Sequence, residues 1–230
     1  MGRFDDERRE MIALLRERGI ADERLLQVMG KIERHLFVSE PFVNRSYDDT
    51  ALPIANQQTI SQPYTVAFMT EQLAPKAGAK ILEVGTGSGY QAAVLAELGC
   101  RVYTIERHVE LLLHARKMFE RFGYRIGSKA GDGTVGWSEF APYDGIIVTA
   151  AAPEVPDPLL KQLSDGARLV IPVGNMDVQD LIIVTRDGDS YSSRETKGFK
   201  FVPLIGKKDG TASNGPGYAV LNASTFQVLS

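Results

Sequence analysis

The chain is poor in cysteine and carries no strong excess of charge of either sign. Cys100 is the one cysteine among 230 residues, which excludes an internal disulfide framework and favours the cytosol. The formal net charge is −3, so no long-range positive field draws the chain to nucleic acid or to an anionic membrane. We therefore expect a cytoplasmic protein that binds neither nucleic acid nor membrane.

Long apolar runs and clusters of metal ligands are also lacking. Residues 1–10 alternate in charge, which indicates neither a secretory signal nor a membrane anchor. His108 and His114 lie six residues apart on an expected helix and so do not share a face, while His35 stands alone in the sequence. We expect no metal site.

The first 75 residues show apolar residues at helical spacing. The pattern predicts helices over 5–18 and 22–33, with Gly19 ending the first and Asp22 capping the second. A further helix is expected to begin at Pro63, a residue suited to a first helical turn, and to run to Leu73. Residues 1–75 are thus interpreted as an N-terminal helical region.

From residue 80 onward, short apolar runs alternate with helical segments, which is the pattern of a parallel sheet wound through βαβ units. Helices are expected near 89–98, 109–122 and 156–163, and strands at 80–84, 101–105, 124–129, 143–149, 168–173, 180–185, 190–195 and 200–205. The last three strands follow one another without helices. The fold class is α/β: a doubly wound, mostly parallel, Rossmann-like sheet over residues 76–206 with antiparallel C-terminal edge strands and an N-terminal helical extension. Residues 207–230 form a C-terminal extension to which the sequence assigns no role.

A glycine-rich turn follows the first expected strand. Residues 80–90 read Lys-Ile-Leu-Glu-Val-Gly-Thr-Gly-Ser-Gly-Tyr, and we call residues 85–89, Gly85-Thr86-Gly87-Ser88-Gly89, the glycine loop. Glycine lets the main chain turn sharply and lets a ligand approach the amides at the head of a helix. The dinucleotide-binding fingerprint needs glycine at the position of Tyr90, which argues against NAD or FAD. The Gly-Lys-Ser/Thr ending of a phosphate-binding loop is also absent, which argues against a nucleoside triphosphate site. The remaining candidate is a cofactor made of an amino acid joined to adenosine through sulfur.

Three acidic residues extend this candidate cofactor site. Glu106 ends the second strand, 21 residues after Gly85, where a carboxylate can accept both ribose hydroxyls. Asp132, beside Gly133 after the third strand, could accept the adenine amino group, and Glu83 could help fix the amino-acid portion, directly or through water. Each also has a structural interpretation: Glu106 as a solvated strand end and Asp132 as a turn residue. Their order and spacing after the glycine loop favour the cofactor site.

These features resemble the common class of S-adenosylmethionine methyltransferases, and further motifs resemble one family within it. Across about residues 10–206 the chain is similar to the protein-L-isoaspartate O-methyltransferases, and Thr59-Ile-Ser-Gln-Pro63 is specific to that family. The other motifs are Arg34-His-Leu-Phe-Val38, Tyr47, Gln58 to Tyr64, Thr149-Ala-Ala-Ala-Pro153 and Phe201-Val-Pro-Leu204. The length of residues 207–230 departs from a typical member, which leaves the oligomeric state open.

The resemblance implies an activity and a substrate. The enzyme would transfer the methyl group of S-adenosylmethionine to the free carboxylate of isoaspartyl residues in damaged proteins, release S-adenosylhomocysteine and so initiate repair. Ser61 would be the active-site serine, with Thr59 and Val202 beside the bound peptide, so that the N-terminal region contributes the substrate site. Acceptance of D-aspartyl residues and the choice of damaged proteins are left open.

The chemistry is consistent with the residues present. The acceptor carboxylate has a pKa of roughly 3.3 to 3.7 by analogy with a chain terminus, so it is ionised at neutral pH and needs no general base. The reaction joins an anion to a cationic sulfonium methyl, and a closed site that aligns the two and removes water should accelerate it. Ser61 would orient the carboxylate, assisted by Thr59, and the head of the helix at Pro63 would favour the anion. Without the resemblance, Ser61 fits better as a cap of that helix.

Two other functions are compatible with the same cofactor site. The chain could methylate a small molecule or another protein group, or it could be a binding module on a methyltransferase-like scaffold that has lost catalysis. The intact Gly85, Gly87, Glu106, Asp132 and Ser61 argue against such a loss.

Overall fold

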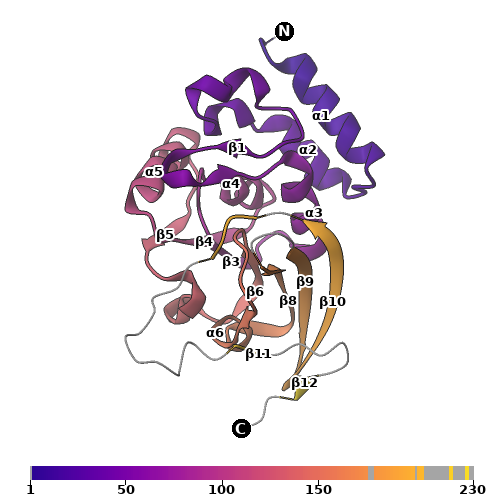
Figure 1. Ribbon diagram of the computed structural model, residues 1–230, viewed down its shortest axis with the longest axis vertical. Coiled ribbons are helices and arrows are strands. Elements are labelled where there is room, and N and C mark those ends of the chain that lie inside the picture. The colour runs from indigo at the N-terminus through magenta and orange to yellow at the C-terminus, as the bar shows by residue number, and fades with distance from the viewer. Residues whose placement is uncertain (1, 176–178, 200, 205–217, 220–225, 228–230) are drawn as a thin grey trace.

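A computed structural model describes residues 2–175, 179–199, 201–204, 218–219 and 226–227. Its centre is an eight-stranded sheet with the order β12-β10-β9-β8-β6-β3-β4-β5 (Figure 1). The parallel part consists of β3 (Lys80–Val84), β4 (Arg101–Glu106), β5 (Gly127–Ala130), β6 (Tyr143–Val148) and β8 (Leu163–Gly174). The edge is antiparallel and consists of β9 (Gln179–Asp187), β10 (Ser190–Phe199) and β12 (Phe226–Gln227). The predicted fold class is confirmed.

The direction of winding reverses at β3. From β3 the chain moves outward to β4 and β5 on one side, and then returns to β6 and β8 on the other. Ligands of open α/β sheets bind beyond the carboxyl ends of the strands at such a reversal. The sheet therefore places its binding position beyond Val84, Glu106 and Val148.

Helices cover both faces of the sheet. One face packs against α3 (Pro63–Leu73), α4 (Tyr90–Glu97) and α5 (Val109–Phe122), and the other against α6 (Asp157–Lys161) and the segment around Trp137. Side chains alternate between the faces as expected for strands: in β3, Ile81 belongs to the first cluster, and Leu82 and Val84 to the second. Both apolar layers are fully buried, so the sheet is a rigid support for its loops.

The N-terminal region packs across one end of the sheet (Figure 1). It contains α1 (Asp5–Glu17), α2 (Glu23–Lys31), the 3₁₀ helices η1 (Arg34–Phe37), η2 (Glu40–Arg45) and η3 (Ala55–Gln57), and the short hairpin of β1 (Leu52–Pro53) and β2 (Thr59–Ile60). Its apolar side chains form one cluster with residues of α4, among them Tyr90 and Val94. The Asp22 side chain accepts a hydrogen bond from the Leu25 amide, which confirms the predicted cap. The region thus shares a core with the α/β body, and the boundary at residue 75 stays a prediction.

Four strand predictions differ from the structure by more than two residues. The strand expected at 168–173 is β8, which already begins at Leu163, and the strand expected at 190–195 is β10, which continues to Phe199. The strand expected at 124–129 is β5, which begins only at Gly127, because Tyr124 still bonds back to the end of α5 through its amide and the Phe119 carbonyl, 2.8 Å apart. The strand expected at 200–205 is wrong for the described residues 201–204, which form one isolated bridge between Pro203 and Ala151. Proline lacks the amide hydrogen that a ladder needs.

Two short strands lie within the predicted C-terminal extension. β11 (Tyr218–Ala219) pairs antiparallel with β7 (Val155–Pro156), and β12 pairs antiparallel with β10 at the sheet edge. The other residues of the extension lie outside the described part of the chain. Within the described ranges, no helix is long and apolar enough to cross a membrane.

Candidate active site

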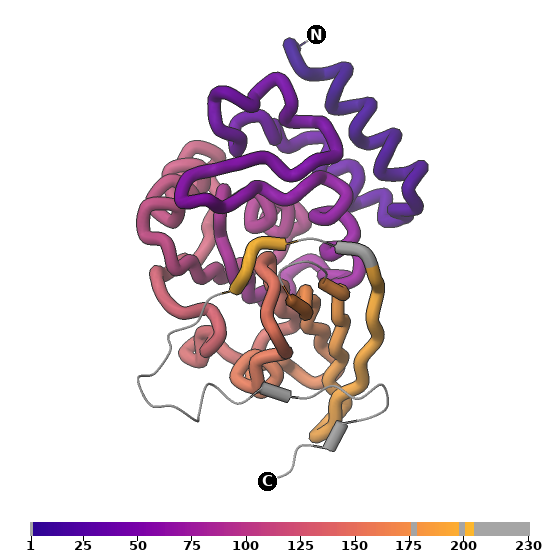
Figure 2. Tube along the Cα trace, in the orientation of Figure 1, coloured from indigo at the N-terminus to yellow at the C-terminus, as the bar shows by residue number. Residues whose placement is uncertain are grey.

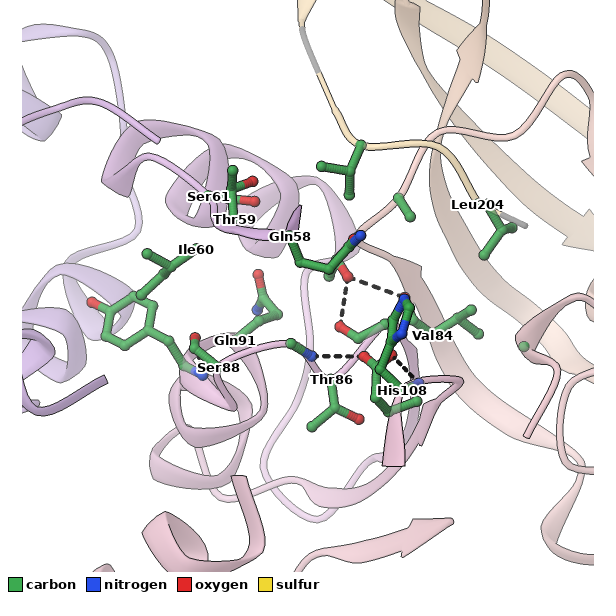
Figure 3. A pocket seen from close by; sticks show the side chains of 18 of the residues that line it. Gln58, Thr59, Ile60, Ser61, Val84, Thr86, Ser88, Gln91, His108 and Leu204 are labelled. Atoms are coloured by element: carbon green, nitrogen blue, oxygen red, sulfur yellow. Dashed lines mark hydrogen bonds between the residues drawn. The ribbon is translucent and has the colours of Figure 1, made fainter. Parts of the chain in front are cut away.

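A pocket of about 930 Å³, measured to its opening to solvent, lies at the carboxyl ends of β3, β4 and β6 (Figure 3). The glycine loop and the residues after β4 form one side, and the hairpin strand β2 with Ser61 forms another. Val202, Pro203 and Leu204 form a third side. The segment 201–204 runs beneath the N-terminal region (Figure 2). The pocket wall contains nine of the eleven predicted site residues: Thr59, Ser61, Gly85, Thr86, Gly87, Ser88, Glu106, Gly133 and Val202.

The glycine loop turns sharply between β3 and α4. Gly85 has a φ of +97° and Gly89 a φ of +86°, a region that favours glycine. A Cβ atom at Gly85 would lie 2.4 Å from the Thr149 hydroxyl oxygen, and one at Gly89 would lie 2.9 Å from the Phe119 ring. Because the close approaches leave no room for side chains, the main chain itself faces the pocket.

Glu106 holds this loop in place. Its side chain is 5 % exposed, and its two carboxylate oxygens accept hydrogen bonds from the amides of Gly87 and His108, each at 2.9 Å. A carboxylate has about four acceptor positions. Glu106 also lines the pocket, and the predicted binding of a diol at its remaining positions stays a prediction.

Asp132 caps a short helix next to the pocket. Its Oδ1 accepts hydrogen bonds from the Thr134 amide at 2.9 Å and the Thr134 hydroxyl at 2.7 Å, and so caps the short helix η4 (Gly133–Val135). Gly133 lines the pocket, whereas Asp132 is not part of its wall. The interpretation of Asp132 as a turn residue is therefore correct, and its contact with an adenine stays a prediction.

Glu83 lies beneath the glycine loop and outside the pocket wall. It is fully buried on the face of β3 that packs against α4. The Thr104 hydroxyl donates to Glu83 Oε2 at 2.5 Å and is itself 2.6 Å from the Thr86 hydroxyl, which does line the pocket. Burial raises the pKa of Glu83 to about 8. An effect of Glu83 on a ligand therefore has to pass through this chain of hydroxyls.

Ser61 does not cap the helix that follows it. The N-cap position of α3 is Gln62, whose side chain makes no capping bond. The first turn is satisfied by Asp49, whose Oδ1 accepts the Tyr64 amide hydrogen at 2.8 Å. The structural interpretation of Ser61 is thus wrong. The expected attraction of an anion to the head of α3 is also weakened, because Asp49 already occupies it.

Two motifs that are distant in the sequence, residues 149–153 and residues 201–204, are joined by main-chain hydrogen bonds. The Ala151 amide donates to the Val202 carbonyl at 2.7 Å, and the Leu204 amide donates to the Ala151 carbonyl at 2.6 Å. The Phe201 amide donates to Gln179 Oε1 at 2.8 Å. These bonds hold Val202 where it lines both this pocket and a second hollow.

The second hollow adjoins the first at Ser61. It is lined by Arg18, Tyr64, Lys197 and Phe201, among others, and has a volume of about 1280 Å³ including its opening. Five residues belong to the walls of both hollows: Thr59, Ser61, Thr65, Thr149 and Val202. None of the five is an acid or a base.

Comparison with known proteins decides the family. The model of the family "Protein-L-isoaspartate(D-aspartate) O-methyltransferase" matches residues 6–209. The chain belongs to this family. The match ends near the start of the predicted C-terminal extension, so most of that extension lies outside it.

Two bacterial methyltransferases of the family are similar to this chain over nearly their whole length. A protein-L-isoaspartate O-methyltransferase of Salinibacter ruber is 49% identical over 219 residues, covering 90% of this chain and 95% of that protein. One of Geobacter metallireducens is 51% identical over 207 residues, covering 89% and 96%. A solved structure named protein-L-isoaspartate O-methyltransferase superposes with a TM-score of 0.79 at 26% identity, and the match covers 86% of this chain and 66% of that one. A Plasmodium falciparum structure, described as a β-aspartate methyltransferase in complex with S-adenosyl-L-homocysteine, shares the fold at a TM-score of 0.75 and 24% identity, covering 85% of this chain and 97% of that one.

Several residues that line the pocket of this methyltransferase were not predicted as site residues. Gln58 and Gln91 line it, and the side-chain amide of Gln91 (Nε2) donates to the Thr70 hydroxyl at 2.9 Å. His108, considered in the sequence only as a metal ligand, also lines it. Its position two residues after Glu106, at the end of a parallel strand, is the signal that could have identified it. Among the described residues, no group of three or more histidine, cysteine or acidic side chains could hold a metal ion.

The geometry of Glu106 predicts a defect in cofactor binding. Glu106→Gln keeps the shape but loses the charge and one acceptor, so the affinity for S-adenosylhomocysteine, measured by calorimetry, should fall about 10- to 100-fold. Glu110→Gln, an exposed change on the adjacent helix, serves as the control and should bind normally. Unchanged affinity in Glu106→Gln would remove Glu106 from the ribose site.

The burial of Glu83 predicts a pH-dependent stability. Because its folded-state pKa of about 8 exceeds the ordinary value of 4.5, the folded chain holds a proton that the unfolded chain releases between these values. The free energy of unfolding should therefore fall as pH rises through this window, by roughly 1 kcal/mol per pH unit. In Glu83→Gln, this slope should disappear. Parallel slopes in urea titrations of the two proteins at pH 5.5, 6.5 and 7.5 would contradict the prediction.

Proposed function

We propose that this methyltransferase transfers the methyl group of S-adenosylmethionine to the free α-carboxylate of isoaspartyl residues in damaged proteins and so initiates their repair. The observation that carries the proposal is the junction of two hollows at Thr59 and Ser61. The first, which we call the inner hollow, contains the glycine loop and Glu106, and the second is lined by Arg18, Tyr64 and Lys197. A cofactor and a polypeptide could approach the same serine from opposite sides.

The residues of the inner hollow fit S-adenosylmethionine. Glu106 would accept the ribose hydroxyls, the main chain of Gly85 to Ser88 would face the amino-acid portion, and Gly133 and Asp132 would lie at the adenine. A Cβ at Gly133 would lie 2.3 Å from Val84 Cγ1, so the Gly133 main chain packs tightly against the end of β3. When bound, this cofactor supplies an electrophilic methyl group on a positively charged sulfur.

The junction supports methyl transfer without a general base. The acceptor carboxylate is already ionised at neutral pH, and the five residues shared by both hollows include no acid or base. The Ser61 hydroxyl would donate a hydrogen bond to one carboxylate oxygen and so direct the other toward the methyl carbon. Thr59, on the same short strand, would assist.

Exclusion of water would supply much of the remaining rate enhancement. The reactants carry opposite charges that disappear in the products, so solvation by water stabilises the reactants more than the transition state. Ile60, Val66 and Met69 give the inner hollow apolar walls next to Ser61. A carboxylate bound there would lose its water while the serine keeps it aligned.

The cellular setting is part of the same proposal. The substrates would be isoaspartyl-containing proteins and peptides, and the site would act without a metal, nucleic acid or membrane. The single cysteine and the near-neutral charge support a cytoplasmic location.

A pair of isomeric peptides tests the substrate. A peptide with one isoaspartyl residue should accept methyl groups from S-adenosylmethionine, while the same peptide with a normal aspartyl residue should not, because only the former presents a free α-carboxylate. Methyl-ester formation would be followed by mass spectrometry. Equal labelling of both peptides would favour a different methyl acceptor, and binding of cofactor without any transfer would favour a non-catalytic binding module.

Ser61→Ala tests the assigned orientation. The variant should bind S-adenosylhomocysteine normally and lose about 10- to 100-fold in kcat toward the isoaspartyl peptide, since one positioning hydrogen bond is removed. Ser192→Ala, an exposed change on β10, is the matched control. Full activity of Ser61→Ala would discard the role.

A further inference from the structure

Arg34, the first residue of the Arg34-His-Leu-Phe-Val38 motif, lies in the interior directly behind Ser61. Its side chain is fully buried in the cluster formed by the N-terminal region and α4. The guanidinium donates from Nε to the Ser46 carbonyl at 2.7 Å and from Nη2 to the Ser61 carbonyl at 2.8 Å. The main chain of the proposed active-site serine is thus tied to a buried cation.

The same guanidinium contacts the cofactor side of the site. It lies over the Tyr90 ring, 4.7 Å from the ring centre. Tyr90 is the first residue of α4, directly after the glycine loop, and it lines the inner hollow. One side chain therefore fixes the position of the substrate segment relative to the helix that follows the glycine loop.

Arg34 forms no ion pair with a carboxylate of the described residues, although Asp49 is close enough to attract its charge. Within the described part of the chain, no carboxylate comes within 4.0 Å of it, and its Nη1 is buried without a hydrogen-bond partner. Asp49 itself forms an ion pair with Arg18. A buried cation without a paired anion is costly, and apolar side chains of similar volume often serve stability as well. Stability alone is therefore a poor explanation for an arginine here.

We infer that Arg34 is a positioning residue for methyl transfer: it fixes the main chain of Ser61 so that the serine hydroxyl faces the acceptor carboxylate. The inference rests on the proposed function. A planar guanidinium suits this task because its donors have a fixed spacing that matches two carbonyl groups at once. Its charge, one hydrogen bond away from Ser61, also favours an anion in the junction.

The two effects act on different kinetic constants. The negative charge of the acceptor declines in the transition state, so attraction to Arg34 strengthens substrate binding and acts on KM. Alignment through the Ser61 main chain acts on kcat. Arg34→Lys keeps the charge but loses the fixed spacing, so it should lower kcat about 10- to 100-fold with little change in KM. Arg34→Gln loses both and should also raise KM.

A double-mutant cycle with Ser61→Ala tests the inference. If Arg34 acts through the serine hydroxyl, Arg34→Lys should lower kcat strongly in the wild-type chain but less than about 3-fold in the Ser61→Ala background. Phe37→Leu removes buried packing from the same 3₁₀ helix and leaves both carbonyl bonds intact. Its effect on kcat should be the same in both backgrounds. Thermal unfolding and S-adenosylhomocysteine affinity are measured for every variant.

Each outcome is decisive. Strong coupling to Ser61→Ala, with normal cofactor affinity in Arg34→Lys, supports positioning. Equal effects of Arg34→Lys in the two backgrounds, or loss of cofactor affinity in step with Phe37→Leu, overturn it, as does failure of both Arg34 variants to fold. If the unmodified enzyme does not methylate the isoaspartyl peptide, the proposed function fails first and this inference fails with it.

Discussion

The hydrogen bond from the Gly87 amide to the Glu106 carboxylate joins the ends of two neighbouring strands, and the pocket depends on it. Thr149 makes the corresponding connection from β6, because its hydroxyl donates to the Gly85 carbonyl at 2.6 Å. Three parallel strands thus end on one loop whose main chain is exposed to the pocket. Because Glu106 both holds this loop and lines the pocket, the group that builds the site is also the one available to bind a ligand.

Much of the fold could be predicted because its signals are local. The apolar run before Gly85, the capping Asp22 and the proline at the head of α3 lie within a few residues of the features they determine, and the bounds of β3, α3 and α5 agree with expectation. The segment after Lys200 could not be predicted in this way. Its main-chain groups bond to Ala151 and to the Gln179 side chain, which are distant in the sequence. A run of apolar residues does not reveal whether its partners will be a strand or scattered groups.

The site shows the same division between local and distant information. Without the family resemblance, Ser61 before Pro63 fits a helix cap better than a catalytic role. The structure excludes the cap, because Gln62 is the N-cap residue and Asp49 accepts the Tyr64 amide hydrogen. Arg34 belongs to a motif that the sequence reveals, but the positioning role proposed for it rests on its hydrogen bonds to the Ser46 and Ser61 carbonyls, which only the structure shows. Glu83 was expected to help fix the amino-acid portion of the cofactor, but alternation along β3 places it on the face of Ile81, outside the pocket wall. Its effect on a cofactor stays a prediction.

The charged side chains at the proposed site would contribute to the binding of the two reactants, whereas catalysis would depend on how the reactants are aligned. Glu106 faces the place proposed for a positively charged cofactor, and Arg34 lies behind the place proposed for a negatively charged acceptor. Both reactant charges vanish together, so neither protein charge can stabilise the transition state more than the reactants. Glu83, held neutral by its raised pKa, adds no further negative charge near the glycine loop. The proposed rate enhancement would then come from alignment by the fixed main chain on either side of the junction and from the exclusion of water, without a general acid or base.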